Sequence, residues 1–548
     1  MSEYRWLNEF SQQFLERDYL LPGQTVDDRV NQICNRAEKI LNIDGYASKL
    51  KKYIQNGWFS LSTPIWSNFG SERGCPISCF GSYIEDSMQS ILDTHAEVGM
   101  MSKLGGGTSG FFGDLRHRGS PITNNGESFG SVHFMSLFDT LIRVVSQGST
   151  RRGSFAAYLP IEHKDIKEFL QIRKEGNPLQ EILTGVTITD KFMQDMIGGN
   201  VDNRTIWAEV LNTRTHTGLP YIIFIDNVNK NTVDVYKDKN LKITHSNLCT
   251  EIFLPDTIDE SFVCDLASMN ILYYDEWKNT DAVEVLTFLL DAVMTEFIEK
   301  TKNIKHMERA NKFARNHRAL GIGWIGWHSY LQSKMIPFES MDAKYENVKI
   351  AQSIQEQAWQ ASKKLAQLYG EPPLLKGYGR RNSTLTAIAP TKSSAFILGQ
   401  MSETTEPHRS NYYVKDLQKG KFTIKNPELI KLLNNKNKNT KEIWDSILKN
   451  NGSVQHLDFL NQLEKDTFKT FMEISPLETI IQNSQRQKYI DQGQSLNLMI
   501  DPRLPVKELN QLLIKAWELG VKSLYYQFSI NAAQQLTQQI TNCKSCEA

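Results

Sequence analysis

The stretch Phe262-Val-Cys-Asp-Leu-Ala-Ser-Met-Asn-Ile-Leu-Tyr-Tyr274 is a mostly apolar run typical of a β-strand. A strong amphipathic helical stretch follows it at residues 282–301. Similar β-like runs at residues 77–84, 219–225 and 385–388 also alternate with helical stretches. Alternation of this kind over several hundred residues predicts an α/β architecture with parallel strands, either an open sheet or a barrel.

The segments outside this alternation have a different composition. Apolar residues recur at helical spacing through residues 26–43, so we expect helices before the first strand. A second strong helix is expected at residues 345–369, where Gly370 suits a helix end. Residues 411–451 are rich in Lys and Asn and are expected to be a solvated surface region. Residues 529–548 contain four Gln and are expected to form a mobile tail.

The composition is typical of a globular protein, with 40% apolar and 23% charged residues in a chain of 548. Lys+Arg and Asp+Glu both number 62, and this balance argues against a general nucleic-acid or membrane-surface binder. No apolar run approaches the ~18 residues that a membrane helix needs. The charged residues 1–20 are unlike a signal peptide, so we expect a cytoplasmic protein with reduced thiols. Seven cysteines then need a reason other than a disulfide framework.

The first candidate site is Ser246-Asn-Leu-Cys-Thr-Glu251. In extended backbone, the spacing of two would point Asn247, Cys249 and Glu251 to one face. A nearby carboxylate disfavours a thiolate, so this thiol suits work as a neutral S–H or a sulfur radical, with Glu251 handling a proton. A buried structural cysteine remains an equally good interpretation of the triplet alone.

Two other pairs of cysteines are candidates for redox chemistry. Cys79 and Cys264 each lie in a β-like run, and if they meet, they form a long-range dithiol of the redox-active kind; two unrelated core cysteines are the alternative. Cys543-Lys-Ser-Cys546 lacks the four ligands of a closed zinc site and is not placed like a thioredoxin motif. A dithiol on a mobile terminus suits thiol–disulfide exchange.

Three further motifs are weak by themselves. The adjacent Tyr525 and Tyr526 are compatible with ordinary strand packing. The run Gly321-Ile-Gly-Trp-Ile-Gly326 matches a dinucleotide fingerprint, but the polar, basic residues before it are not a hydrophobic strand. The run Gly105-Gly-Gly-Thr-Ser-Gly110 lacks the lysine of a phosphate-binding loop and is expected to be a tight turn.

Seven motifs in order along the chain resemble the large, catalytic subunit of class I ribonucleotide reductases. The resemblance extends from about residue 61 to the last cysteine, and the set is highly specific although each motif is weak. The motifs are Leu61-Ser-Thr-Pro-Ile-Trp, Ser78-Cys-Phe, Ser246-Asn-Leu-Cys-Thr-Glu-Ile, Val263-Cys-Asp-Leu, Ala389-Pro-Thr-Lys-Ser-Ser, Asp491-Gln-Gly-Gln-Ser-Leu-Asn and Leu524-Tyr-Tyr-Gln.

The resemblance implies a fold and a domain division. The fold would be a ten-stranded α/β barrel made of two parallel five-stranded halves, with a finger loop that carries the radical cysteine into its centre. Residues 1–70 would be an N-terminal helical region, residues 71–528 the barrel with helical insertions, and residues 529–548 a tail with the redox Cys-x-x-Cys.

The resemblance also implies roles in the reduction of ribonucleotides to deoxyribonucleotides. Cys249 would become a thiyl radical that takes the 3′ hydrogen of the ribose. Glu251 would act as the base on the 3′ hydroxyl, and Asn247 would hold the substrate. Cys79 and Cys264 would protonate the leaving 2′ hydroxyl and supply two electrons.

Further sites and partners come from the same resemblance. Tyr525 and Tyr526 would carry the radical from a metal-containing small subunit, since no metal or cofactor is expected in this chain. Cys543 and Cys546 would re-reduce the active-site disulfide and be reduced by thioredoxin or glutaredoxin. The chain is expected to form a homodimer with nucleoside triphosphates as effectors. The expected phosphate-site residues are Thr63, Ser78, Thr391, Lys392, Ser393 and Ser394, and the expected effector-site residues are Asp86, Ser87 and Arg116, near loops 119–130 and 173–180.

Three points separate this chain from other possibilities. Long family members begin with a nucleotide-binding ATP-cone, whereas here the N-terminus leads almost directly into the helical region, so control by ATP and dATP at such a domain is not expected. A class II reductase, which uses adenosylcobalamin, is the main alternative, but Ser246-Asn-Leu-Cys favours class I. A catalytically dead, nucleotide-binding paralogue is disfavoured because all five active-site and tail cysteines are present.

Overall fold

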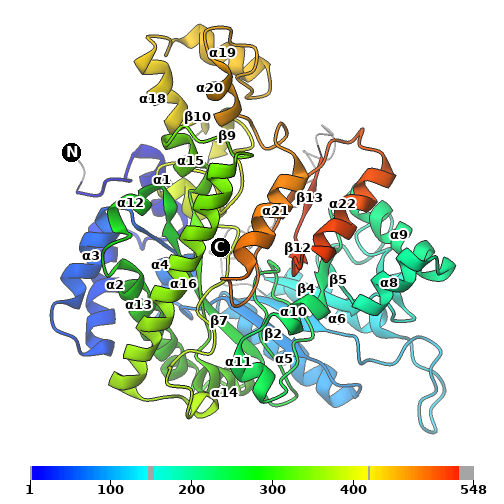
Figure 1. Ribbon diagram of the computed structural model, residues 1–548. Helices are drawn as coiled ribbons and strands as arrows, with labels where there is room; N and C mark the ends of the chain where they lie inside the picture. The colour runs from blue at the N-terminus through cyan, green and yellow to red at the C-terminus, as the bar shows by residue number, and fades with distance from the viewer. Residues whose placement is uncertain (1–2, 146–152, 418–419, 530–548) are drawn as a thin grey trace.

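Strands lie in the middle of the molecule (Figure 1), in a computed structural model that describes residues 3–145, 153–417 and 420–529. Their pairing closes them into a ring. Five neighbouring strands, each parallel to the next, form the first half of the ring. These strands are β2 (Cys79–Tyr83), β3 (Gly107–Phe111), β4 (Ser154–Pro160), β5 (Leu183–Ile188) and β6 (Tyr221–Phe224).

The second half contains two regular strands and three short extended segments. Strand β7 (Phe262–Asn270) is parallel to β8 (Leu320–Ile325), and parallel bridges continue from Ile322 to Thr386 and from Ile388 to Gln494. The segment after Gln494 then pairs with residues near the end of the described chain, because β11 (Leu498–Met499) is parallel to β13 (Gln527–Phe528).

Two antiparallel seams join the halves. Strand β7 pairs with β2 on one side, and β12 (Ser523–Leu524) pairs with β6 on the other. Ten strands or extended segments thus close the ring, which confirms the expected barrel of two parallel five-stranded halves. Glycines make the close packing possible: a Cβ on Gly321 would meet the side chains of Leu266 and Ala387 at 2.4 and 2.9 Å. The glycine-rich run that matches a dinucleotide fingerprint is therefore explained by the close packing of strand β8 in the barrel.

Helices cover the outside of the ring. Helix α13 (Ala282–Thr301) is buried along most of its length, and α16 (Met341–Tyr369) packs against it and ends at Gly370 (φ +81°). Both helices were expected from the sequence. The other long helices around the barrel are α5 (Met88–Lys103), α6 (Ser131–Val144), α8 (Asp190–Gly198), α9 (Val201–Thr217), α14 (Glu308–His317), α21 (Pro476–Gln487) and α22 (Val506–Glu518).

The N-terminal region is joined to the barrel by a strand as well as by helix packing. Its helices α1 (Glu9–Asp18), α2 (Val26–Leu41) and α3 (Tyr46–Gln55) precede β1 (Phe59–Leu61), which is antiparallel to β7. Helix α2 begins at a capping box between Thr25 and Asp28. The apolar side chains of this region belong to the same core as those of the barrel.

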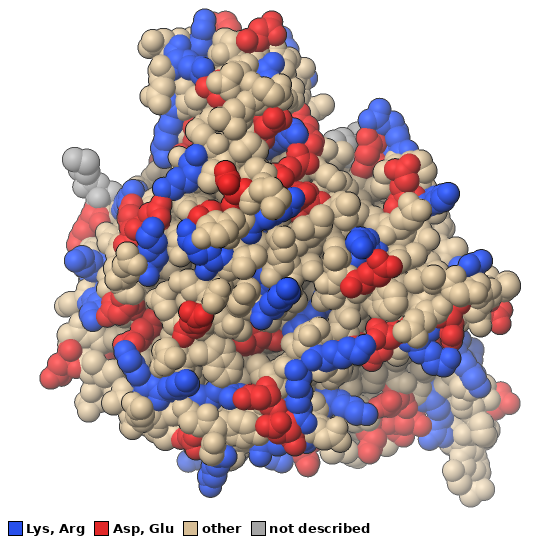
Figure 2. Space-filling view, in the orientation of Figure 1, with Lys and Arg blue, Asp and Glu red and all other residues tan. Residues whose placement is uncertain are grey.

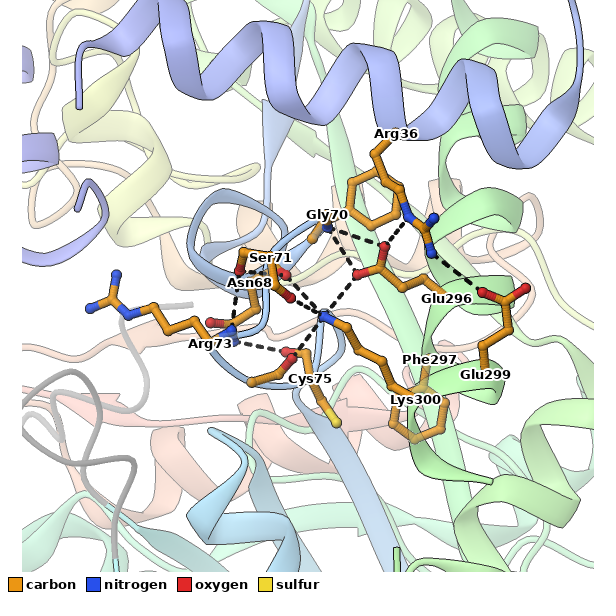
Figure 3. A network of polar contacts seen from close by, with 12 residues as sticks. Arg36, Asn68, Gly70, Ser71, Arg73, Cys75, Glu296, Phe297, Glu299 and Lys300 are labelled. Atoms are coloured by element: carbon orange, nitrogen blue, oxygen red, sulfur yellow. Dashed lines mark hydrogen bonds and ion pairs between the residues drawn. The ribbon is translucent and has the colours of Figure 1, made fainter. Parts of the chain in front are cut away.

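A buried ion network ties helix α2 to helix α13 and to the loop that leads into β2 (Figure 3). The Glu296 carboxylate accepts hydrogen bonds from Arg36 Nε at 2.6 Å and from the backbone N–H of Gly70 at 2.9 Å. Lys300 Nζ lies 3.0 Å from Glu296 Oε1 and donates to backbone carbonyls of the loop, including that of Ser71. The network thereby fixes the loop that precedes Cys79.

Residues 411–470 form a small lobe with its own core, at the top of Figure 1. The expectation of a merely solvated region was wrong, because Trp444 and neighbouring apolar residues are buried together, while the lysines whose burial is described are partly or fully exposed. The elements of this lobe are β9 (Tyr412–Leu417), β10 (Gly420–Lys425), α18 (Pro427–Asn435), α19 (Lys441–Lys449) and α20 (Gln462–Thr467).

The surface carries charges of both signs. On the face shown in Figure 2, lysines and arginines alternate with aspartates and glutamates, and no extended area of one sign is visible there. Among the described residues, no helix has the length and apolar character needed to cross a membrane.

Candidate active site

Residues 246–251 form a turn inside the barrel. Asn247 Oδ1 accepts hydrogen bonds from the backbone N–H groups of Glu251 at 3.2 Å and Ile252 at 3.1 Å, which closes the turn. Thr250 adopts a left-handed backbone conformation with φ +66°. The expectation of extended backbone was wrong here, because a turn, and not the alternation of a strand, brings the three side chains together.

The turn is attached to both halves of the barrel. The Tyr158 hydroxyl on β4 donates to the backbone carbonyl of Asn247 at 2.6 Å. On the other side, Ser495 Oγ lies 2.6 Å from the backbone carbonyl oxygen of Cys249. Two short hydrogen bonds from opposite walls therefore hold the loop that carries the candidate radical cysteine.

One cavity collects the expected catalytic side chains. Asn247, Cys249 and Glu251 line it together with both Cys79 and Cys264. All five residues are buried, which shields chemistry in the cavity from bulk water. The other lining residues are Ser60, Ser62, Ser78, Gly107, Leu248, Asp265, Leu266, Ala267, Ser268, Ala389, Pro390, Thr391 and Ser394.

Cys79 and Cys264 are directly opposite each other where β2 meets β7. Opposed residues of an antiparallel pair have Cα atoms about 4.5–5.5 Å apart, within the range that a disulfide needs. Asn247 Nδ2 lies 3.8 Å from the Cys79 sulfur, and Gln492 Nε2 donates to the Cys264 sulfur at 3.3 Å. Burial raises the pKa of the Cys264 thiol well above its usual value, so this sulfur stays protonated at neutral pH.

The carboxyl group of Glu251 is buried beside the loop cysteine. Burial raises the pKa of Glu251 to about 7, although hydrogen bonds to the carboxylate, including one from Ser495 Oγ at 3.2 Å, act in the opposite direction. A carboxyl group with this pKa can both accept and release a proton near neutral pH.

Half of the six expected phosphate-site residues line the cavity. Ser78, Thr391 and Ser394 line it directly. Thr391 has φ +50° and precedes helix α17 (Lys392–Ile397), and its Oγ1 accepts a hydrogen bond from the backbone N–H of Thr404 at 2.8 Å. Hydroxyl and backbone N–H groups at such a turn are the donors that a phosphate prefers.

The remaining residues of this group lie close by without lining the cavity. Thr63 begins helix α4 (Thr63–Asn68), and its hydroxyl is 3.3 Å from that of Tyr19. Ser393 is buried in the first turn of α17, and Lys392 Nζ lies 5.9 Å from the centre of the Phe528 ring.

Tyr525 and Tyr526 have their rings in contact, with centroids 4.4 Å apart. Tyr221 packs against both rings, at 4.9 and 5.2 Å. The two tyrosines lie between β12 and β13, so they do not alternate across a strand. The backbone N–H of Tyr525 bonds to the carbonyl of Leu496, the residue after Ser495, which connects the pair to the Cys249 loop.

The expected effector residues also meet. Arg116 Nε and Asp86 Oδ2 form a half-exposed ion pair at 2.8 Å, and Ser87 caps helix α5 by accepting a hydrogen bond from the N–H of Ser90. The tail cysteines Cys543 and Cys546 lie outside the described residues. Among the residues that are described, no three His, Cys, Asp or Glu side chains are grouped to hold a metal ion.

Three side chains at the site received no role from the sequence: Tyr158, Gln492 and Ser495. Gln492 and Ser495 belong to a motif that supported the resemblance, and the polar character of that motif next to apolar strands was the available signal. Tyr158 lies in an apolar strand, where nothing in the sequence distinguishes it from an ordinary core residue.

Comparison with known proteins agrees with the fold. The family described as "Ribonucleotide reductase, barrel domain" matches residues 77–200, 195–374 and 373–527. The fold and the cysteine-bearing loop thus define the class, and the chain belongs to the ribonucleotide reductase family. Within that family it is a large, catalytic subunit of the class I type, as the following similarities show.

Similar proteins come from a virus, an animal and a bacterium. The chain is 32% identical over 599 residues to a ribonucleoside-diphosphate reductase large subunit of Invertebrate iridescent virus 3, covering 95% of this chain and 92% of the relative. It is 29% identical to the corresponding subunit of Caenorhabditis elegans, covering 95% and 76%. The solved structure of the Actinobacillus ureae class Id ribonucleotide reductase alpha subunit is 55% identical, with a TM-score of 0.92 and coverage of 96% and 98%.

Proposed function

We propose that this chain reduces ribonucleoside diphosphates to 2′-deoxyribonucleoside diphosphates, with Cys249 as the thiyl radical. The observation that carries the proposal is the cavity in which the Cys249 loop faces the Cys79–Cys264 pair. A hydrogen-abstracting sulfur and a two-electron donor are then available to one bound ribose. Relatives named as ribonucleoside-diphosphate reductases support the choice of a diphosphate.

In the proposed reaction, the Cys249 radical removes the 3′ hydrogen and Glu251 takes the proton of the 3′ hydroxyl. Asn247 holds the substrate by hydrogen bonds. Cys79 and Cys264 protonate the 2′ hydroxyl, which leaves as water, and supply two electrons as their thiols become a disulfide. The balance is one ribonucleotide and two thiols giving one deoxyribonucleotide, one disulfide and one water.

The protonation states of the site support these roles. A carboxyl group with a pKa of about 7 suits Glu251 as a base at neutral pH, and a thiol kept neutral by burial suits Cys264 as a proton donor. The hydroxyls of Ser78, Thr391 and Ser394 are suited to hold the diphosphate, with Thr63, Lys392 and Ser393 nearby.

A class I α subunit receives its radical from a separate small subunit. In our proposal a metal-containing small (β) subunit supplies the radical, and Tyr525 and Tyr526 relay it. The contact between the two rings and the link to the Cys249 loop through Leu496 and Ser495 support this path. The dithiol Cys543–Cys546 would re-reduce the active-site disulfide and be restored by thioredoxin or glutaredoxin in the reducing cytoplasm.

We also propose that two copies of the chain associate through helices α5 and α6. Their surface exposes large apolar side chains, namely Met88 and Leu92 on α5 and Leu137 and Val144 on α6. Helices α5 and α6 pack against each other, and contiguous exposed apolar surface is typical of an interface. Nucleoside triphosphate effectors would bind near Asp86, Ser87 and Arg116, at the start of α5.

The decisive experiment is reduction of CDP by the purified chain with a dithiol and ATP. Three conditions are compared: the chain alone, the chain with adenosylcobalamin, and the chain with the small subunit from the same source. Turnover with the small subunit only is expected. Turnover with adenosylcobalamin alone would make this a class II enzyme, and effector binding without turnover or oxidation of Cys79 and Cys264 would make it an inactive regulatory paralogue.

A further inference from the structure

The backs of the two cysteine-bearing strands carry buried polar groups. Successive side chains of a strand point to opposite faces, so Cys79 and Cys264 face the cavity while Ser82 and Ser261, three positions along, face the helices. Both serines are fully buried. A buried hydroxyl needs a hydrogen-bond partner, and the apolar layer between strands and helices offers few.

One carboxylate satisfies both serines. Glu97, a buried residue of helix α5, accepts hydrogen bonds at Oε2 from Ser82 Oγ at 3.0 Å and from Ser261 Oγ at 2.9 Å. Arg309 Nη1 on helix α14 lies 3.1 Å from the same oxygen. Burial raises the pKa of Glu97, and the charge of Arg309 opposes that shift. Burial of a charged carboxylate costs desolvation free energy. A buried acid that is hydrogen-bonded to both strands therefore points to a specific role.

Arg309 extends the connection to the backbone of the same two chain segments. Its Nη2 donates to the carbonyl of Tyr83, at the end of β2, at 3.0 Å. The same nitrogen donates to the carbonyl of Thr257, shortly before β7, at 2.8 Å. Glu97 and Arg309 together therefore hold β2 and the entry to β7 from the side opposite the cavity.

The position of these contacts along the ladder fixes the register. The pairs run Cys79 with Cys264, Phe80 with Val263 and Gly81 with Phe262. The next step brings Ser82 to Ser261, and Glu97 Oε2 bridges these two side chains. A slip by one residue would turn a serine of one strand away from Glu97 and a cysteine away from its partner.

We propose that Glu97 is a positioning residue that locks the register of β2 against β7 and thereby sets the thiol–disulfide equilibrium of Cys79 and Cys264. This inference rests on the proposed dithiol role of the two cysteines. When the two thiols form the disulfide, they release two protons and two electrons to the substrate, or to an oxidised dithiol in a redox buffer. Holding the sulfurs face to face favours the disulfide, because closure then costs less conformational entropy.

The test is the midpoint potential of this pair in the full-length chain. The protein is equilibrated in dithiothreitol buffers of defined potential, and the Cys79–Cys264 disulfide is quantified by alkylation, proteolysis and mass spectrometry. Glu97→Ala is expected to lower the dithiol-to-disulfide equilibrium constant about tenfold, which raises the potential by about 30 mV. Glu97→Gln keeps an acceptor oxygen for the serines and should restore most of the wild-type value.

A second variant separates the lock from folding defects. Ser82→Ala with Ser261→Ala leaves the Glu97–Arg309 pair intact and should shift the potential in the same direction. Combined with Glu97→Ala, it should add no further shift, since Glu97→Ala already removes the hydrogen bonds of both serines to Glu97. The matched control is Glu464→Gln, which alters a glutamate buried in the remote helix α20 and should leave the potential unchanged.

The possible results distinguish a failure of the proposed function from a failure of the register lock alone. If wild-type protein forms no reversible Cys79–Cys264 disulfide, the proposed function fails first and the lock fails with it. If the wild-type couple is present and Glu97→Ala matches the control, the lock alone is overturned. Should Glu97→Ala not fold, an unchanged potential in the double serine variant overturns the lock equally.

Discussion

Cys79 and Cys264 are paired at the seam where β2 of the first half-barrel runs antiparallel to β7 of the second half. Neighbouring strands within each half are parallel, so the antiparallel pairing of β2 with β7 occurs where the two halves meet. The antiparallel seam supplies the direct opposition that a disulfide needs. The architecture of two parallel halves thus creates the geometry of a redox pair.

Replacement of the loop cysteine tests the radical assignment. Cys249→Ser should reduce turnover with the small subunit to background, because a serine hydroxyl does not form an accessible oxygen radical. Effector affinity should be unchanged, since Cys249 lies in the cavity and the Asp86–Arg116 pair lies at the start of α5. Turnover and effector binding are measured on the same preparation. Residual turnover in this variant would contradict the assignment of Cys249 as the radical cysteine.

The raised pKa of Glu251 makes a prediction for the pH dependence. The group is neutral below about pH 7 and ionised above it, so a base role requires that kcat/KM fall with decreasing pH, with an apparent pKa of about 7. Glu251→Gln should lack turnover at every pH. An acid limb near pH 4.5, the ordinary value for glutamate, would contradict the role of burial.

The same ionisation affects folding in the opposite direction. Because burial favours the neutral form, the native state binds the proton more tightly than the unfolded state, and the free energy of unfolding falls as the pH rises from 4.5 through about 7. Glu251→Gln removes this contribution. Urea denaturation at pH 5 and pH 8 should therefore show a smaller loss of stability in the variant than in the wild type.

The tyrosine pair is tested by removing one hydroxyl. Tyr526→Phe should stop turnover driven by the small subunit, since phenylalanine cannot relay a proton-coupled radical at an accessible potential. The change should cost only about 1 kcal/mol of folding free energy. Tyr330→Phe, which removes another buried tyrosine hydroxyl, should retain activity. Normal activity of Tyr526→Phe would indicate another radical source.

Much of the barrel could be predicted because its strands and helices have distinct sequence patterns. Helix α13 agrees with the expected range of 282–301, and β7 begins at Phe262 as expected. Residues 385–388 were expected to be β-like, and they contribute only bridges from Thr386 and Ile388. Such a short segment is extended because its neighbours hold it there, so tertiary context decides its structure.

The site was only partly predictable for the same reason. The turn at residues 246–251 depends on hydrogen bonds from Tyr158 and Ser495, which are distant in sequence. The spacing of two predicted a shared face for Asn247, Cys249 and Glu251, and they do line one cavity. A turn, and not extended backbone, brings them together. The opposition of Cys79 and Cys264 is likewise a long-range relationship, which the resemblance implied and the residues alone left open.

The tail dithiol is tested by deletion of residues 542–548. The truncated chain should lose thioredoxin-driven turnover, because thioredoxin then has no external dithiol to reduce. It should keep activity with a small dithiol such as dithiothreitol, which can enter the cavity directly. Replacement of Cys543 and Cys546 by serine is the matched full-length variant and should behave in the same way. Equal loss of activity with both reductants would count against a shuttle role.

The network around Glu296 makes a prediction about stability (Figure 3). Glu296 is only 1% exposed and faces Arg36 and Lys300, so Glu296→Gln removes the charge that both cations share. The expected loss of unfolding free energy is about 2–3 kcal/mol, measured by urea denaturation. Glu299→Gln on the same helix is the control, because this glutamate is 61% exposed and its ion pair with Arg36 is screened by water.

The consequence for activity follows from where the network lies. Glu296 also accepts the backbone N–H of Gly70, and Lys300 binds carbonyls of the loop that enters β2. A looser loop should disturb Cys79 and Ser78 before it unfolds the barrel, so KM for the nucleotide should rise in Glu296→Gln but not in Glu299→Gln. If both variants have the same KM and the same stability, the loop is held by packing alone, and the buried ion network does not position the cavity.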